Sequence, residues 1–399
     1  MQISKIKAYL FPVVILLLLN ITACIEEYNL EIDEYKNLLV IEGSIIKEDS
    51  IQTVKISQTT PIDKPDSINP VSGCQVNVVN GNGLEFFFDE TSPGTYTAKI
   101  PQENLQFNEK FKLQVTTPDG NKYASHYETI LECSPVDSIY PIAKKYQSAA
   151  LQFESGLQYY IDLKAPDSFT RNYRWAMVET WEYHAPYSLD AIFYVTGWDS
   201  WGHPIGYFDY DPEHFLDTIC WQTKKVSVLS SSSTRNLTVN EKKKIPLNYI
   251  PGTSIKLSVK YSLLVKQYSL SDSAYLFWNQ NKVETQESGG LYQSQPGQAI
   301  SNIRNVNNSS EIVLGFFWAS SFTEKRVFYQ GPFPDWECDC HLIPFKLGEY
   351  YNGTGKEDWL HDMNDPPIPG SFKPGISLAR CMDCTARGGT AIKPDFWED

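Results

Sequence analysis

Short segments in which every second residue is apolar fill residues 38–131. These segments place apolar side chains on one face of a strand, as at Val54 and Ile56; Cys74, Val76 and Val78; Phe111, Leu113 and Val115. Turn-forming residues separate the segments, most clearly at 80–83, where Asn-Gly-Asn-Gly tolerates positive φ. The pattern predicts about seven strands, so we expect residues 37–136 to form an immunoglobulin-like or transthyretin-like β-sandwich.

Residues 137–399 predict a second, larger β-rich domain. Apolar residues alternate with polar ones over 157–163 and, most clearly in the whole chain, over 255–265. Residues 311–321 and 325–330 are expected to form a late hairpin. The chain is therefore predicted to be mainly β.

One short helix interrupts this strand pattern, over about 272–287. Ser271 is suited to cap it, Asp272 suits the positive end of its dipole, and Gly289-Gly290 would end it. The four serines at 230–233 are expected to form a loop.

The charge balance excludes some classes of partner. The 399 residues carry a formal net charge of −14. Nucleic-acid affinity depends largely on cationic contacts to phosphate, and anionic membranes attract basic faces. We therefore expect no nucleic-acid partner and no attachment to a membrane through a basic surface.

Residues 1–23 are typical of a signal peptide. Lys5 and Lys7 precede the apolar run 11–19, which is too short to span a bilayer. The following "ITAC" resembles the lipobox of bacterial lipoproteins, in which the cysteine, here Cys24, is acylated and becomes the first residue. Several acyl chains would anchor the protein stably in outer-membrane lipid. The alternative is an ordinary signal peptide followed by a chance cysteine.

Glu26 and Glu27 directly follow this cysteine, in a segment that we interpret as an acidic tether over 24–36. An acidic pair in this place resembles the signal that sends lipoproteins of Bacteroidota to the outer face of the outer membrane. We therefore expect an outer-membrane, lipid-anchored protein that faces the cell exterior. Alternatively, the two acids are only part of the composition of the tether.

The cysteines after Cys24 are expected to form disulfides, the default at a cell surface. Cys74 and Cys133 are the only cysteines of the first domain and could pair with each other. The second domain holds five, of which Cys338, Cys340, Cys381 and Cys384 are candidates for disulfides. Alternatively, Cys338 and Cys340 with His341, and Cys381 with Cys384, would ligate zinc. Residues 381–397 also contain a glycine pair and end in two aromatic rings, Phe396 and Trp397. We expect a clasp in which both rings insert into the second domain.

Residues 183–215 are dense in aromatic side chains with interleaved Gly and Pro. The candidates for contact with a ligand or partner are Tyr187, Trp198, Trp201, Tyr207 and Tyr210. Such rings bury a large area at a low entropy cost. The alternative is that the same rings pack in the core of the second domain.

Catalytic motifs are not evident in the sequence. It has no Gly-x-Ser-x-Gly elbow, no His-Glu-x-x-His pair and no phosphate-binding glycine loop. Asp209, Asp211 and Glu213 would suit calcium, but three alternate acids are common in loops. We therefore assign no catalytic residue, no metal site and no cofactor.

Four passages resemble a family of Bacteroidota outer-membrane lipoproteins of unknown function: residues 38–45, 267–297, 311–320 and 381–397. Members of that family are commonly encoded beside TonB-dependent receptors. The resemblance implies a non-enzymatic accessory or ligand-capture subunit of a TonB-dependent transporter. The alternatives are a hydrolase of extracellular polymers and a structural subunit of an outer-membrane assembly or secretion complex.

Overall fold

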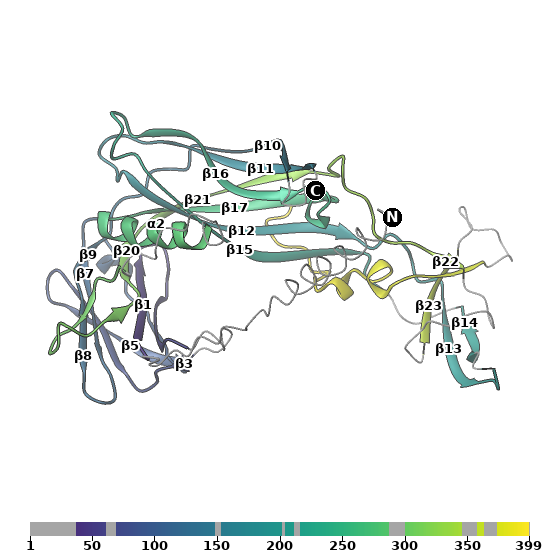
Figure 1. Cartoon of the computed structure of the whole chain (residues 1–399), viewed down its shortest axis with the longest axis horizontal. Helices are drawn as coiled ribbons and strands as arrows, with labels where there is room; N and C mark the ends of the chain where they lie inside the picture. The colour runs from purple at the N-terminus through teal and green to yellow at the C-terminus, as the bar shows by residue number, and fades with distance from the viewer. Residues whose placement is uncertain are drawn as a thin grey trace, which may run out of the picture.

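The computed structural model describes residues 37–60, 69–147, 153–201, 204–210, 216–286, 300–344, 357–362 and 373–398. The fold is mainly β, as predicted, and the described residues contain one α-helix. Figure 1 shows a first β-sandwich, a second one beside it, and a small sheet at the far end of the molecule. No helix in these ranges has the length and apolar character needed to cross a bilayer. Cys24, Glu26 and Glu27 lie outside the described residues.

The first sandwich is one continuous twelve-stranded sheet that curves around its core. Nine strands follow the order β18-β8-β7-β4-β5-β6-β2-β1-β19, and the other three pair beside this path: β20 with β1, β3 with β2, and β9 with β7. The predicted faces are correct: Val54, Val78 and Phe111 are fully buried in this core. Its N-terminal strands are β1 (Leu39–Ile46), β2 (Gln52–Gln58), β3 (Asn69–Pro70), β4 (Gln75–Asn80), β5 (Glu85–Ser92), β6 (Thr95–Ala98), β7 (Lys110–Thr116), β8 (Lys122–Ser125) and β9 (Glu128–Thr129), with a 3-10 turn at Gln102–Asn104.

Three strands from much later in the chain complete this sheet: β18 (Ile303–Asn305), β19 (Val313–Leu314) and β20 (Phe317–Ser320). The range 37–136 does not include them. Strands β19 and β20 run parallel to β1, with Gly43 opposite Phe317. The late hairpin expected over 311–330 is therefore wrong, because the buried ring of Phe317 belongs to the first core. Gly315 permits the turn between the two strands, with φ +88° and its α-carbon against the backbone of Ile41.

The second sandwich consists of two facing sheets, β10-β11-β16 and β15-β12-β17-β21. Their apolar faces form one core around Tyr159, Trp175 and Leu263. The strands are β10 (Ser138–Gln147), β11 (Phe153–Lys164), β12 (Asn172–His184), β15 (Ile219–Ser233), β16 (Glu241–Pro251), β17 (Lys260–Ser269) and β21 (Phe322–Gln330).

One local expectation for this sandwich is confirmed only in its later part, and a second is wrong. Tyr261, Leu263 and Val265 of the strand expected over 255–265 are fully buried in β17. Ile255–Leu257 is a 3-10 turn, and β17 begins only at Lys260, because the Ser254 side chain accepts a hydrogen bond from the Lys256 N–H and caps the turn. The serines at 230–233 are not a loop: they end strand β15, where they pair with the first residues of β12.

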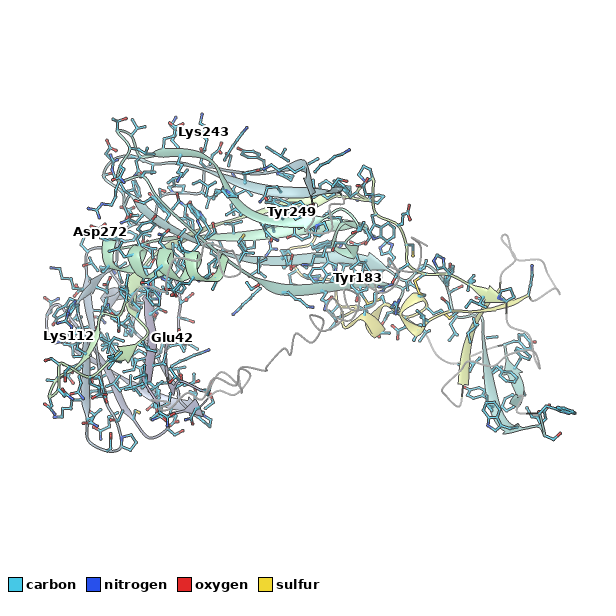
Figure 2. The ribbon with its side chains drawn as sticks, in the orientation of Figure 1. Glu42, Lys112, Tyr183, Lys243, Tyr249 and Asp272 are labelled. Carbon is cyan, nitrogen blue, oxygen red and sulfur yellow. A yellow bond between two sulfur atoms is a disulfide. The ribbon has the colours of Figure 1, made fainter. Side chains whose placement is uncertain are left out.

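Helix α2 (Asp272–Gln286) lies at the joint between the two sandwiches, and Figure 2 shows Asp272 at its start. Ser271 caps the helix as predicted, accepting a hydrogen bond from the Ala274 N–H over 3.1 Å. The Ser271 and Ser273 hydroxyls also donate to the buried carboxylate of Glu128 from the first sandwich, over 2.6 and 2.7 Å. Burial raises the pKa of Glu128. The helix start therefore ties the two sandwiches together.

The C-terminal segment crosses the far end of the second sandwich as a clasp. Trp397 is only 5% exposed, and its indole N–H donates to the Glu182 carboxylate over 2.9 Å. Gly389 approaches the hydroxyl of Tyr183 so closely that a Cβ would lie 2.3 Å away. Phe396 departs from the expectation, because its ring stays 37% exposed and packs against the guanidinium of Arg326. Trp397 is thus the anchor of the clasp.

We predict that Trp397→Ala lowers the free energy of unfolding by roughly 3–5 kcal/mol, the usual cost of deleting a buried aromatic ring. The measurement is the melting temperature of the purified chain. Ile392→Ala is the matched control within the same segment, because Ile392 is 78% exposed and should cost almost nothing. Equal melting temperatures for the two variants would contradict the anchoring role.

Candidate functional site

A small five-stranded sheet projects from the far end of the second sandwich, and we call it the arm (Figure 1). Its strand order is β14-β13-β23-β24-β22. The strands are β13 (Ala191–Trp198), β14 (Pro204–Asp209), β22 (Ile343–Pro344), β23 (Glu357–Asp362) and β24 (Pro374–Ile376). Its small core consists of Ala191 and Phe193, with Val195, Phe208 and Ile376 against them. The arm therefore has packing of its own.

The β13–β14 hairpin exposes a group of aromatic rings. The exposed fractions are 54% for Trp198, 84% for Trp201, 58% for Tyr207 and 60% for Tyr210. Trp198 and Trp201 are the exposed tryptophans among the side chains that the structure describes. Tyr207 lies with Tyr194 on one face of the hairpin, whereas Tyr210 lies with Phe208 on the other. Exposed large apolar side chains of this kind are typical of contact surfaces. Ile205, 52% exposed, adds to the apolar area.

Cross-strand pairing orders part of this surface. Tyr194 lies directly opposite Tyr207, with ring centroids 5.4 Å apart. The ring of Tyr210 stacks on that of Phe208 at 5.7 Å, and Phe208 in turn contacts the buried Phe193. Aromatic pairs at such distances are stabilising. The exposed tyrosines are therefore held in place before any partner arrives.

The charge of the hairpin is negative. Residues 190–210 contain Asp190, Asp199 and Asp209 but no lysine or arginine. Rings beside carboxylates can stack on sugar rings, or pack against a neutral or cationic protein surface.

Tyr187 does not belong to this surface. It lies before β13, and its side chain is half-buried. Its hydroxyl donates to the Cys340 carbonyl, and its N–H donates to the Cys381 carbonyl, each over 3.1 Å. Tyr187 therefore helps to fix the base of the arm, whereas the other four candidate rings lie together on the hairpin.

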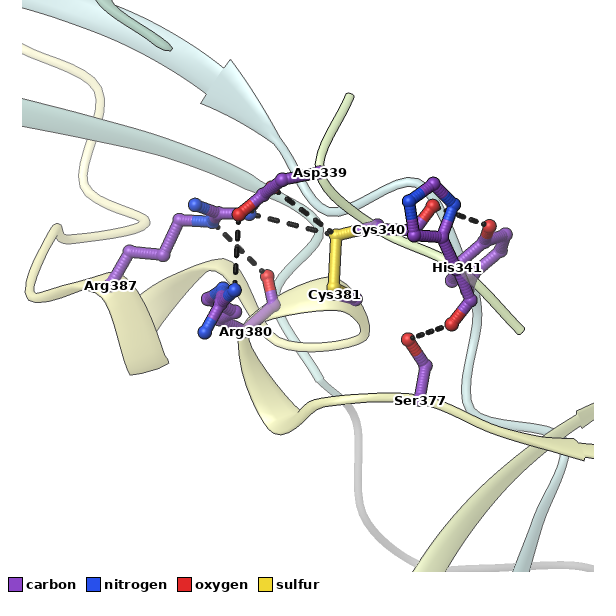
Figure 3. Close-up of a disulfide and its surroundings, with 8 residues drawn as sticks. Asp339, Cys340, His341, Ser377, Arg380, Cys381 and Arg387 are labelled. Atoms are coloured by element: carbon purple, nitrogen blue, oxygen red, sulfur yellow. Dashed lines mark hydrogen bonds and ion pairs between the residues drawn. A yellow bond between two sulfur atoms is a disulfide. The ribbon is translucent and has the colours of Figure 1, made fainter. Parts of the chain in front are cut away.

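Two disulfides hold the base of the arm. Cys340–Cys381 joins the segment that leads into β22 to the clasp, and Cys220–Cys384 joins the clasp to strand β15. Figure 3 shows Asp339 beside the first disulfide, paired with Arg380 at 3.1 Å and Arg387 at 2.7 Å. The guanidinium of Arg387 holds the pKa of the Asp339 carboxyl below its usual range.

Three of the cysteines that were expected to form disulfides are free thiols. Cys74 and Cys133 do not pair, because each is buried in the core of a different sandwich as a free thiol. Cys338 is also a free thiol, although Cys340, Cys381 and Cys384 are bridged as expected. The zinc alternative is excluded, since three of its four cysteines are in disulfides.

Sequence reasoning missed Cys220 as a disulfide partner. It is fully buried, and the only sign was the odd number of cysteines in the second domain. Of the proposed calcium ligands, Asp209 is part of strand β14, whereas Asp211 and Glu213 lie outside the described residues.

A family model described as "Domain of unknown function (DUF4249)" matches residues 25–326, which is most of the chain. The chain belongs to this family. The whole clasp and the later strands of the arm lie beyond the matched range, whereas the aromatic hairpin lies within it. No curated protein matches the chain.

Two solved structures are similar only weakly. One is a DUF4785 family protein from Legionella pneumophila, with 9% identity and a TM-score of 0.17, covering 59% of this chain and 54% of that one. This chain thus spans about half the length of that protein. The other is the B domain of a biofilm associated protein, with 9% identity and a TM-score of 0.13, covering 73% and 88%.

We predict that native alkylation labels Cys338 and leaves Cys74 and Cys133 unmodified until the chain unfolds. Only the thiolate reacts, and burial raises the pKa of Cys74 and raises that of Cys133 to about 11. Mass spectrometry after labelling with and without denaturant makes the measurement. Recovery of a Cys74–Cys133 disulfide peptide would contradict the cysteine arrangement described above.

Proposed function

We propose that this protein is a surface-exposed, lipid-anchored outer-membrane protein that acts as a non-enzymatic ligand-capture subunit of a TonB-dependent transporter. The aromatic hairpin of the arm would be its contact with the transporter. The observation that carries the proposal is the group of four exposed rings on a projecting sheet whose base is fixed by two disulfides.

The hairpin has the physical properties of a docking element. Tryptophan and tyrosine dominate the binding energy of many interfaces, since they bury much area and lose little rotamer freedom. Trp198 and Trp201 lie at the end of the hairpin, where β13 and β14 meet, and no described strand or helix forms a second layer over this sheet. A partner would therefore bury rings that the protein itself leaves exposed.

The anchor in this proposal is an acylated Cys24, and Glu26 with Glu27 would direct the protein to the outer face of the membrane. The sequence supports this through the lipobox-like "ITAC" and the acidic pair behind it. Membership of the DUF4249 family agrees with the resemblance on which the transporter partner rests. The first sandwich, where the described chain begins at residue 37, and the arm lie at opposite ends of the molecule (Figure 1).

We predict that Trp198→Ala with Trp201→Ala abolishes capture of the transporter. Each truncation of an interface hot spot costs about 2–4 kcal/mol, so the pair should weaken binding by a factor of a hundred or more. The measurement is a pull-down through a C-terminal tag from outer membranes in mild detergent. Phe87→Ala is the control, because Phe87 is 71% exposed on the first sandwich. Unchanged capture by the double variant, with an unchanged melting temperature, would refute the role of the hairpin.

We also predict that Cys24→Ala prevents incorporation of a fatty-acid analogue and leaves a soluble or inner-membrane-retained precursor. Replacing Glu26 and Glu27 by Ala should preserve the lipid label, but protease added to intact cells should no longer digest the protein. Label persisting on Cys24→Ala would contradict the anchor, whereas unchanged digestion of the double variant would contradict the export signal.

A further inference from the structure

A row of side chains under helix α2 contains buried polar groups that form no hydrogen bond with a described residue. Arg174 lies on β12, with Ser231 of β15 directly opposite on one side and Tyr268 of β17 on the other. Residues directly opposite each other in antiparallel strands share a face of the sheet. The three side chains therefore form one row across the sheet, on the face that the helix covers.

Helix α2 adds two residues to this row. Trp278 stacks over Arg174, with its ring centroid 3.8 Å from the guanidinium carbon. Lys282, one turn later on the same face of the helix, donates to the Ser231 carbonyl over 3.1 Å. Helix and sheet thus bring a guanidinium, an ammonium group, an indole and a hydroxyl to one place.

Three buried polar atoms in this place make no hydrogen bond to any residue that the structure describes: Arg174 Nε, Ser231 Oγ and Trp278 Nε1. Two of them are N–H donors and the third is a hydroxyl that can donate. Leaving one such group buried without a hydrogen bond costs about 1–3 kcal/mol of folding free energy. Three such groups in one place therefore indicate that a hydrogen-bond acceptor binds there.

Acids act on one end of the row: together with burial, Asp49, Glu324 and Glu48 raise the pKa of Tyr268, whereas the Arg174 guanidinium lowers it. No ion pair between described residues involves Arg174, Lys282 or the neighbouring Lys242. Lys242 donates to the Ser232 hydroxyl, and its charge, together with burial, lowers the pKa of Lys282. Burial lowers the pKa of Arg174 to about 10.

The acids on the helix do not neutralise this cluster. Asp272 is paired with Arg235 at 2.7 Å and accepts a hydrogen bond from Asn172. Glu284 is exposed and accepts a hydrogen bond from Gln280. Arg174 and Lys282 therefore form no ion pair with a described residue and lie beside unused donors, which is the chemistry of an anion site.

We propose that this row binds a small free inorganic oxyanion such as phosphate, held by Arg174, Ser231, Trp278 and Lys282. A tetrahedral oxyanion accepts several hydrogen bonds at once, so one anion could accept from donors of both the sheet and the helix. Because the three unpaired atoms are buried, an anion that carries a bulky group would not reach them. The bound anion would lock helix α2 onto the sheet at the joint between the sandwiches.

The test measures the melting temperature and the heat of binding of the full chain in mild detergent, titrated with phosphate at constant ionic strength. We expect a saturable rise in melting temperature, because a ligand that binds only the folded state stabilises it. Ser231→Ala and Trp278→Phe each remove one donor with little change in shape, and Lys282→Met removes the ammonium group. Each variant should weaken phosphate binding by about tenfold.

Lys243→Met is the control, because Lys243 is exposed and paired with Glu241. It should bind phosphate like the unchanged chain. Absence of a saturable effect in the unchanged chain would overturn the proposal. So would equal binding by the three donor variants, which would place the anion elsewhere, or an equal effect of chloride, which would show that no oxyanion is recognised.

Discussion

The parallel pairing of β1 with β19 and β20 is the constraint on which the body of this molecule depends. It places residues 313–320 in the first sandwich, together with β18 before them. The second sandwich contains β17, which precedes helix α2 and β18 in the chain, and β21, which follows β20. The chain therefore crosses the joint more than once. Removal of the later residues would leave the first sheet with an open edge at β1, and with Ile41 and Ile45 in an incomplete core.

The joint itself is held by polar as well as apolar contacts. The Glu128 carboxylate accepts hydrogen bonds from the start of helix α2, and Asn302 donates to and accepts from the backbone of Phe317. Buried polar groups that are satisfied in this way fix one relative position of two bodies, because any displacement would leave them unpaired. Glu128 and the start of helix α2 thus fix the first sandwich to one end of the second, and the two disulfides fix the arm to the opposite end.

Local patterns in the sequence identified most faces of strands correctly, because alternation depends only on which side of a sheet is buried. They did not identify which strands pair with each other. The segment 311–320 was recognised as extended, but its pairing with β1 is set by packing around Phe317 and by the turn at Gly315, which involve residues far away in the sequence. Cysteine pairing failed for the same reason: Cys74 and Cys133 both fall within the predicted first domain but lie in different cores.

The candidate site was predictable in part. The aromatic density of 183–215 indicated contact residues, but composition could not separate the exposed Tyr207 from the buried Phe193, a distinction that arises from the hairpin register. Arg174 gave no signal at all, because a charged residue at an alternate strand position is normally solvated. Only the position of helix α2 shows that its Nε is buried.

The pairing of β1 also has a consequence for biosynthesis. The ribosome completes β1 about 270 residues before it makes Phe317, the residue that β1 needs opposite Gly43. During translation, and during any passage across a membrane, the earliest strand thus has an unpaired edge that other extended chains could occupy. Strand β1 is therefore synthesised early but completes its pairing only when residues 313–320 are available. A chaperone would protect the chain most at this strand.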